Sequence, residues 1–87
     1  MKPTIAYDDF AKIDLRVATV LEAREHPNAN KLLLLKISVG DVEKQIVAGI
    51  RGHYEPAELV GTQIIVVNNL EEVVLRGEES QGMLLAA

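Results

Sequence analysis

A chain of 87 residues has room for one domain, which we expect to span residues 1–87. Its composition, 48% apolar and 25% charged, is that of a compact domain and excludes a disordered or fibrous chain. The formal net charge of −4 has the wrong sign for a protein that holds nucleic acid by bulk electrostatics, so any contact with RNA must be local.

The sequence contains no cysteine and no long apolar segment. Without cysteine there is no disulfide, thiolate metal site or thiol nucleophile, which fits the reducing cytoplasm. The longest apolar runs, residues 32–35 and 64–67, are far shorter than the roughly 20 residues of a membrane-spanning helix, and the N-terminus does not resemble a secretory signal. We therefore expect a cytoplasmic protein with no membrane contact.

A short helix is predicted over residues 7–12, because Asp8 and Asp9 near its start and Lys12 at its end suit the helix dipole. We expect its aromatic side chains, Tyr7 and Phe10, to plug one end of a barrel.

The first predicted strand covers residues 13–24, where apolar and charged residues alternate with the period of a half-buried strand. Thr19 and Val20 interrupt the alternation and predict a bulge or bend, as a strand shared by both halves of a curled sheet requires. The residues expected to face the core are Ile13, Leu15, Val17, Leu21 and Ala23.

Two further strands are predicted at residues 31–39 and 43–50, after a loop at residues 26–30 that contains Pro27. A tight turn at residues 40–41 makes them antiparallel neighbours. On the second strand, Leu32 and Leu34 lie on the face opposite the core, which makes that face unusually apolar for a solvated one.

The remaining pattern predicts a short helix at residues 54–61, a strand buried on both faces at residues 62–70, a long polar loop, and a last strand at residues 82–87. The complete order is strand, strand, strand, short helix, strand, strand. This is the order of an all-β, five-stranded OB-fold barrel with one or two short helices.

Five strings of residues are distinctive together, and they occur in order: IDLRV at residues 13–17, NANKL at 28–32, IVAGI at 46–50, YEPAELVG at 54–61 and SQGMLLAA at 80–87. With them the chain resembles the tRNA-binding domain family from about residue 7 to residue 87. That family includes the C-terminal domain of many bacterial methionyl-tRNA synthetases, free-standing structure-specific tRNA-binding proteins, and a module of synthetase-associated cofactors.

The resemblance implies an OB fold that recognises tRNA by shape and backbone, typically as a homodimer. It also implies that the domain raises the RNA affinity of an aminoacyl-tRNA synthetase, and it implies no reaction and no cofactor.

The chain departs from the family in two places. Family members usually continue past the position of Ala87 with a tail that helps to build the dimer interface, so the resemblance is to a shortened form. Residues 71–74 read EEVV where the family commonly has a proline with basic residues, and Glu78 adds a further negative charge. These departures leave open a shortened or redesigned chain.

An OB barrel binds oligonucleotides on its second and third strands and the flanking loops, so the candidate RNA-binding residues are those of these segments. Lys31 is the first candidate for a phosphate contact, and its alternative is a solvated lysine at a strand end. Lys36, Lys44 and Arg51 either extend a track for the RNA backbone or keep the sheet edges soluble. Arg16 is expected to form a surface ion pair with Asp14.

The loop before the last strand supplies a guanidinium, a hydroxyl, an amide and a soft side chain, which suit RNA sugars and base edges. Its alternative role is structural, with the glycines in special backbone angles and Met83 packed inward. With the supporting loop before strand 2, the candidates to add are Asn28, Asn30, Arg76, Ser80, Gln81 and Met83.

Other functions receive less support. Aromatic residues are only 3% of the chain, which argues against a general single-strand binder. His26 and His53 lie in separate loops without the spacing of a zinc site or a catalytic triad, so we expect neither a metal site nor an enzyme. The rival hypothesis is a protein-interaction, dimerisation or engineered scaffold domain with weak or no RNA binding, which would use Leu32 and Leu34 or an unpaired strand edge.

Overall fold

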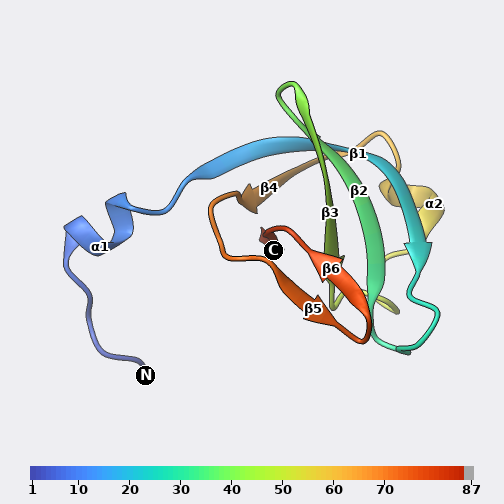
Figure 1. The fold of residues 1–87 in the computed structure, drawn as a ribbon, viewed down its shortest axis with the longest axis horizontal. Coiled ribbons are helices and arrows are strands. Elements are labelled where there is room, and N and C mark those ends of the chain that lie inside the picture. Colours follow the sequence, from blue (N-terminus) through green and yellow to red (C-terminus); the bar gives the residue numbers. More distant parts are fainter. Residues whose placement is uncertain (86–87) are drawn as a thin grey trace.

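The structure is a computed structural model that describes residues 1–85, and it is built on one curled antiparallel sheet (Figure 1). Five strands form that sheet in the order β3-β2-β1-β4-β7, and two more form a separate hairpin. The elements are α1 (Tyr7–Ala11), β1 (Leu15–Glu25), β2 (Leu33–Val39), β3 (Val42–Ala48), α2 (Pro56–Leu59), β4 (Gln63–Val67), β5 (Val73–Leu75), β6 (Glu78–Ser80) and β7 (Met83–Leu85).

Strand β1 is long enough to pair with β4 through its first half and with β2 through its second. The register with β2 shifts between Val20 and Glu22, which confirms the predicted bulge in this strand. Before the bulge the even residues Ala18 and Val20 face the core, so the predicted inward face is wrong for that half. As a result Val17 is 60% exposed, whereas beyond the bulge Ala23 packs against the core.

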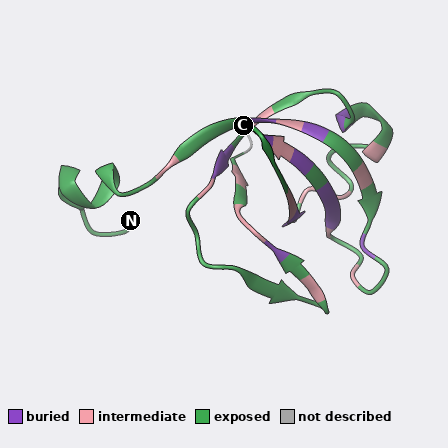
Figure 2. Ribbon diagram, turned by 45° about the horizontal axis from the view of Figure 1, so that its top comes forward, coloured by how far each residue is buried: buried purple, intermediate pink, exposed green. Residues whose placement is uncertain are grey.

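The β2–β3 hairpin forms as predicted, with Val39 opposite Val42 and Gly40 in a left-handed conformation (φ 60°). These two strands supply much of the buried core of the curled sheet (Figure 2), which includes Leu33, Leu35, Ile37, Ile46 and Ala48. The predicted core face of the second strand is therefore confirmed.

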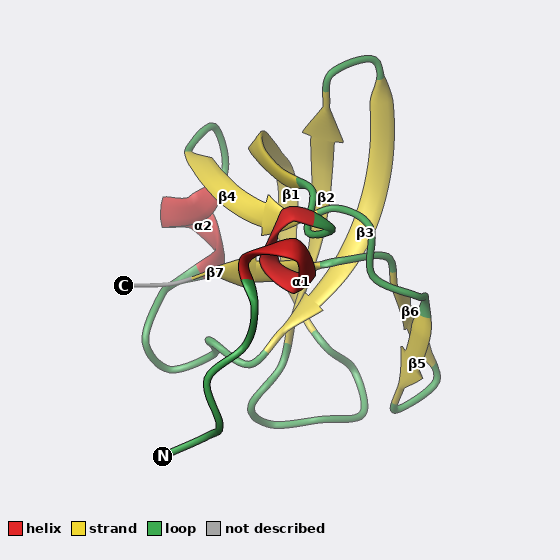
Figure 3. Cartoon of the chain, turned by 90° about the vertical axis from the view of Figure 1, so that its left-hand side faces the viewer, coloured by secondary structure: helices red, strands yellow, loops and turns green. Residues whose placement is uncertain are grey.

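The outer side of β2 and β3 is buried at Leu34 and Val47, contrary to the prediction, and is exposed nearer the turn at Lys36 and Glu43. Leu34 is only 2% exposed and its cross-strand partner Val47 only 9%. The β5–β6 hairpin lies beside β3 (Figure 3) and bonds to it where Ser80 Oγ accepts a hydrogen bond from the Val47 N–H. This hairpin occupies the stretch predicted as a polar loop, and its two-residue turn is Arg76-Gly77, with φ of 53° and 88°.

The sheet curls until its edge strands approach each other beside Gly82. The Gln81 N–H donates to the Gln45 carbonyl oxygen (2.8 Å), and the Gln45 N–H donates to Gln81 Oε1 (3.0 Å). A Cβ atom at Gly82 would lie 3.0 Å from the Val67 carbonyl oxygen, and the φ of 154° also favours glycine. This position brings the start of β7 against β3 and β4.

Strand β4 is buried on both faces only at its end, where Val66 is 1% and Val67 7% exposed, whereas Ile65, on the same face as Val67, is 48% exposed. The prediction of two buried faces therefore holds for the end of the strand and is wrong for its start. In the last predicted strand, residues 83–85 form β7, and residues 86–87 lie outside the described residues.

The two helices differ in their relation to the sheet. Helix α2, predicted from Pro56 and Gly61, buries Leu59 in the core. Helix α1 extends from the sheet on the first residues of the chain (Figure 1), with Tyr7 77% and Phe10 50% exposed, so the prediction that they plug a barrel end is wrong. Neither helix, nor any other within residues 1–85, is long and apolar enough to span a membrane.

Candidate nucleic-acid interface

The structure brings together four of the predicted RNA-binding residues around one hollow. The loop between β1 and β2 and the turn between β5 and β6 enclose about 560 Å³. We call this site the cationic hollow, and its lining residues are Asn28, Ala29, Asn30, Lys31, Leu32 and Arg76. Amide groups and two cations thus converge from segments far apart in the sequence.

A buried histidine joins the two segments. His26 is 2% exposed, its Nε2 lies 3.0 Å from the Leu75 carbonyl oxygen, and its Nδ1 accepts a hydrogen bond from the Asn28 N–H (3.0 Å). Because Nδ1 is an acceptor here, the neutral ring carries its proton on Nε2 and donates it to Leu75. His26 therefore links the residue before Arg76 to the loop that carries Lys31.

Arg51 stabilises the same loop from another side. Its Nη1 donates to the Ala29 carbonyl oxygen (3.0 Å), and its Nη2 forms an ion pair with Glu25. The predicted residue therefore lies beside the cationic hollow, with both terminal nitrogens of its guanidinium already bonded within the protein.

Lys31 and Arg76 are both exposed, and they differ from most of the basic residues in having no partner. Five of the nine basic side chains form an ion pair or hydrogen bond within residues 1–85, namely Lys12, Arg16, Lys36, Lys44 and Arg51. Lys31 and Arg76 form neither in that range. Arg76 also adopts a left-handed backbone conformation, which costs a non-glycine residue about 1–2 kcal/mol.

Lys36 and Lys44 do not line the cationic hollow, although both border a smaller hollow of about 300 Å³ that also includes Glu22 and Glu43. In the register Lys36 faces Gln45 and Lys44 faces Ile37, so the two lysines lie on opposite faces of the hairpin. Lys36 pairs with Glu43 (3.3 Å), and Lys44 Nζ donates to Asn68 Oδ1 (2.8 Å). The structure offers no continuous basic track along these strands.

Ser80, Gln81 and Met83 lie on the other side of the β5–β6 hairpin. Ser80 is 3% exposed, and its Oγ accepts from the Val47 N–H (2.9 Å) and donates to the Gly82 carbonyl oxygen (3.1 Å). Gln81 bonds to Gln45 and Glu72. Met83 is 49% exposed and lines an apolar hollow of about 630 Å³ with Leu70, Val73 and Leu75. An RNA contact by these three residues remains a prediction.

A polar network at the other end of β1 includes the predicted Asp14–Arg16 ion pair, which is confirmed at 2.8 Å. Asn68 Nδ2 also donates to Asp14 (3.2 Å), and Lys44 bonds to the same Asn68. The hydrogen bond from Arg16, and then that from Asn68, lower the pKa of the Asp14 carboxyl below its ordinary value. This network ties β1 to the end of β4 and to β3.

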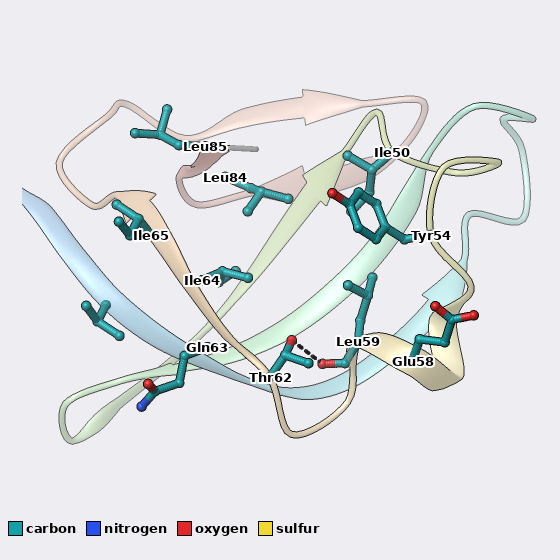
Figure 4. Close-up of a pocket in the computed structure, with 11 residues that line it drawn as sticks. Ile50, Tyr54, Glu58, Leu59, Thr62, Gln63, Ile64, Ile65, Leu84 and Leu85 are labelled. Atoms are coloured by element: carbon teal, nitrogen blue, oxygen red, sulfur yellow. Dashed lines mark hydrogen bonds between the residues drawn. The ribbon is translucent and has the colours of Figure 1, made fainter. Parts of the chain in front are cut away.

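A larger hollow of about 670 Å³ lies between α2 and the sheet (Figure 4). Its walls are mostly apolar, from Leu59, Ile64 and Leu84, and its only charged lining residue is Glu58. It has no cation to attract phosphate and a carboxylate that repels it, so it is a poorer candidate for nucleic acid than the cationic hollow. Within residues 1–85, no three His, Asp or Glu side chains cluster as metal ligands.

Four of the six residues that line the cationic hollow were predicted from the sequence, but the role of His26 was not. The partner of His26 is a carbonyl group 49 positions away, and any residue type could supply that carbonyl. The sequence carries no signal for such a contact.

A curled β-sheet with a cationic site between two connecting loops is typical of the small barrel domains that bind oligonucleotides. The chain belongs to the tRNA-binding domain family, since the family described as "Putative tRNA binding domain" matches residues 15–87. This confirms the resemblance found in the sequence.

Comparisons with individual relatives support the same family assignment. A methionine–tRNA ligase from Chlorobium chlorochromatii is 55% identical over 85 residues, which cover 98% of this chain and 12% of the ligase. The MetRS-related protein from Pyrococcus horikoshii has a TM-score of 0.92 at 36% identity, covering 99% of this chain and 79% of that one. The chaperone CsaA from Bacillus anthracis has a TM-score of 0.87 at 32% identity, covering 98% and 78%. The chain thus spans about 12% of the ligase that it matches.

Proposed function

We propose that this chain is a non-catalytic tRNA-binding module, a single OB-fold domain over residues 1–87 that recognises tRNA by its shape and backbone. Its family and the strand order around the curled sheet support the proposal. The relatives are methionine–tRNA ligases and a MetRS-related protein, so the proposed setting is a cytoplasmic synthetase, with the module either attached to it or acting beside it.

The observation that carries the proposal is the pair of unpartnered cations at the cationic hollow. Lys31 and Arg76 come from two different loops, and neither forms an ion pair or hydrogen bond within residues 1–85. A left-handed arginine whose side chain has no hydrogen bond or ion pair to the described residues contributes nothing evident to folding, which favours a role toward a ligand. Two cations with neighbouring amides suit adjacent phosphate and ribose oxygens of an RNA strand.

The negative net charge of the chain makes the cationic hollow selective for the shape of the RNA backbone. Glu71, Glu72, Glu78 and Glu79 lie in or next to the β5–β6 hairpin and repel phosphate. An RNA backbone is therefore attracted only where its phosphates lie along the cationic hollow, and in other positions its phosphates are repelled by these glutamates. We infer recognition of one local backbone shape rather than a general affinity for polyanions.

Direct contacts are assigned to Lys31 and Arg76, with Asn28 and Asn30 in support. Lys36, Lys44 and Arg51 would reach RNA only by giving up their present partners. Ser80 and Gln81 would act by fixing the hairpin on β3, and Met83 is free to meet a base edge. This division narrows the broader set predicted from the sequence.

Titration of a folded tRNA at low and moderate salt tests the function. We expect binding near 50 mM salt. The plot of log K against log salt should be less steep for Lys31→Gln and for Arg76→Gln, by about 0.7–0.9 for each variant, because each loses one phosphate contact. Lys2→Gln, a change of the same charge far from the hollow, is the control and should leave the slope unchanged. No binding of the unaltered chain near 50 mM salt overturns the proposal.

We further propose that the module pairs with a second copy of itself, as the family resemblance implies. The observation in favour is an apolar row across three adjacent strands, Val17 on β1, Ile65 on β4 and Leu85 on β7, which are directly opposite one another in the register. Their exposures are 60%, 48% and 45%. This face replaces Leu32 and Leu34, the contact surface predicted from the sequence.

A further inference from the structure

We infer that His26 is the positioning residue that assembles the RNA site, by holding the Arg76 turn against the Lys31 loop. The inference rests on the proposed function and adds a residue that touches no RNA. The evidence is the hydrogen bond of its Nε2 to the Leu75 carbonyl oxygen, which spans 49 positions.

No other side chain within residues 1–85 makes a hydrogen bond or ion pair between these two segments. Arg51 binds Ala29 and Glu25, which belong to the loop and to β1. The His26 N–H closes the base of the same loop on the Leu32 carbonyl oxygen (3.1 Å). The bonds of Arg51 and of the His26 N–H shape the loop, whereas the Nε2 bond joins the loop directly to the residue before Arg76.

The two ring nitrogens have separable tasks. Nδ1 accepts from the Asn28 N–H and is local to the loop, whereas Nε2 reaches the hairpin. Asparagine places a polar atom near the position of Nδ1, and glutamine places one near the position of Nε2. His26→Asn therefore keeps the local bond and loses the bridge, while His26→Gln keeps the bridge and loses the local bond.

The experiment measures tRNA affinity and its salt dependence for both variants of the 87-residue chain. We expect His26→Asn to bind about tenfold more weakly, which is near the effect of losing the charge-assisted hydrogen bond of Arg76 to phosphate. Its plot of log K against log salt should also be less steep, by about 0.8. His26→Gln should stay within about threefold of the unaltered chain, since a neutral hydrogen bond contributes less. His53→Phe, at the exposed histidine outside the site, is the control for changing a histidine.

A double-mutant cycle separates positioning from general destabilisation. If His26 acts through Arg76, His26→Asn should weaken binding little further in an Arg76→Gln background. Thermal unfolding of each variant without RNA shows whether it is folded at the temperature of the titration. An unfolded variant is titrated at a lower temperature, at which it is folded.

Each outcome is decisive. If the unaltered chain binds tRNA but His26→Asn binds equally well, or loses no more than His26→Gln, the positioning role is overturned and the proposed function stands. Additive losses in the cycle overturn it as well. If the unaltered chain does not bind, the proposed function itself fails.

Discussion

Arg76 occupies a backbone position that suits asparagine or glycine better than arginine. It is the first residue of the two-residue β5–β6 turn, with φ of 53°, and Gly77 follows with φ of 88°. An Asn-Gly pair is strongly preferred in such turns, since asparagine tolerates the left-handed region. Arginine here lowers stability, and its unpartnered guanidinium provides what RNA binding needs.

Arg76→Asn should therefore raise stability and weaken RNA binding together. We expect a gain of about 0.5–1 kcal/mol in the free energy of unfolding from the relieved backbone strain, with a melting temperature several degrees higher. The tRNA affinity should fall as for Arg76→Gln. Calorimetry and the salt titration measure the two effects, and a variant that is both less stable and unaltered in binding would contradict this view of the turn.

Asp14 makes stability depend on pH in a defined direction. Hydrogen bonds from Arg16 and Asn68 lower its pKa in the folded chain below the ordinary 3.8, so the carboxylate stabilises the fold above that pH. This contribution is lost as the pH falls through the lower, folded value. The folded state binds the proton less readily than the unfolded state, so acid favours unfolding.

Asp14→Asn should accordingly lower the melting temperature at neutral pH, and its difference from the unaltered chain should shrink as the pH falls below 3.8. Melting curves at a series of pH values measure this difference. Glu22→Gln, which removes a carboxylate with no hydrogen bond or ion pair within residues 1–85, is the matched control. A difference that stays constant across the series would show that Asp14 acts without its charge.

The β5–β6 hairpin is the element on which both the hollow and the sheet edge depend. Ser80 attaches it to the free edge of β3 by satisfying the Val47 N–H, and Gln81 and Gln45 add a reciprocal pair of bonds. A buried edge strand needs such partners because its N–H groups cannot reach water.

Ser80→Ala should destabilise the chain by about 1–3 kcal/mol, since it leaves the Val47 N–H buried without an acceptor. Hydrogen exchange should show the Val47 amide becoming less protected, more than amides at the β1–β2 pairing. Ser38→Ala is a useful comparison, because Ser38 Oγ bonds only to the nearby Gly40 carbonyl oxygen. An equal loss in the free energy of unfolding for the two variants would mean that the contact of Ser80 with the edge of β3 contributes no more than a local hydrogen bond.

The elements that could be predicted from the sequence are those with local signals. Gly40 marks the β2–β3 turn and Pro56 the start of α2, and the alternation from Leu33 to Val39 marks a core strand. The β5–β6 hairpin could not be predicted, since each of its strands has three residues and four glutamates lie in or just before it. Strand periodicity needs longer runs than that.

The errors in burial have the same origin in long-range structure. The side of β1 that faces the core was mispredicted because the register with β2 shifts after Val20, and a one-residue shift exchanges the two faces. Leu34 was expected to be exposed because the hairpin that accompanies its burial was not foreseen. Four of the six residues that line the hollow could be predicted, whereas the partners of Lys44, Ser80 and Arg51 depend on contacts between segments far apart in the sequence.

At the scale of the whole molecule, the apolar row predicts self-association. Val17→Lys places a charge at the most exposed residue of the row, so we expect the unaltered chain to be a dimer and the variant a monomer in sedimentation at the same concentration. Val42→Lys, at a valine with 54% exposure in the β2–β3 hairpin, is the matched control and should leave the dimer intact. An unaltered chain that remains monomeric at high concentration would remove this prediction.

The hollow between two distant loops also connects RNA binding to folding. Its walls meet only when the chain has joined residues 49 positions apart, so an incompletely folded chain has neither the site nor its affinity. By mass action, tRNA at 100 times its dissociation constant would then stabilise the folded state by about 2.7 kcal/mol. The nucleic acid thereby becomes a folding ligand, and protection of the chain by tRNA against proteolysis would measure its affinity independently.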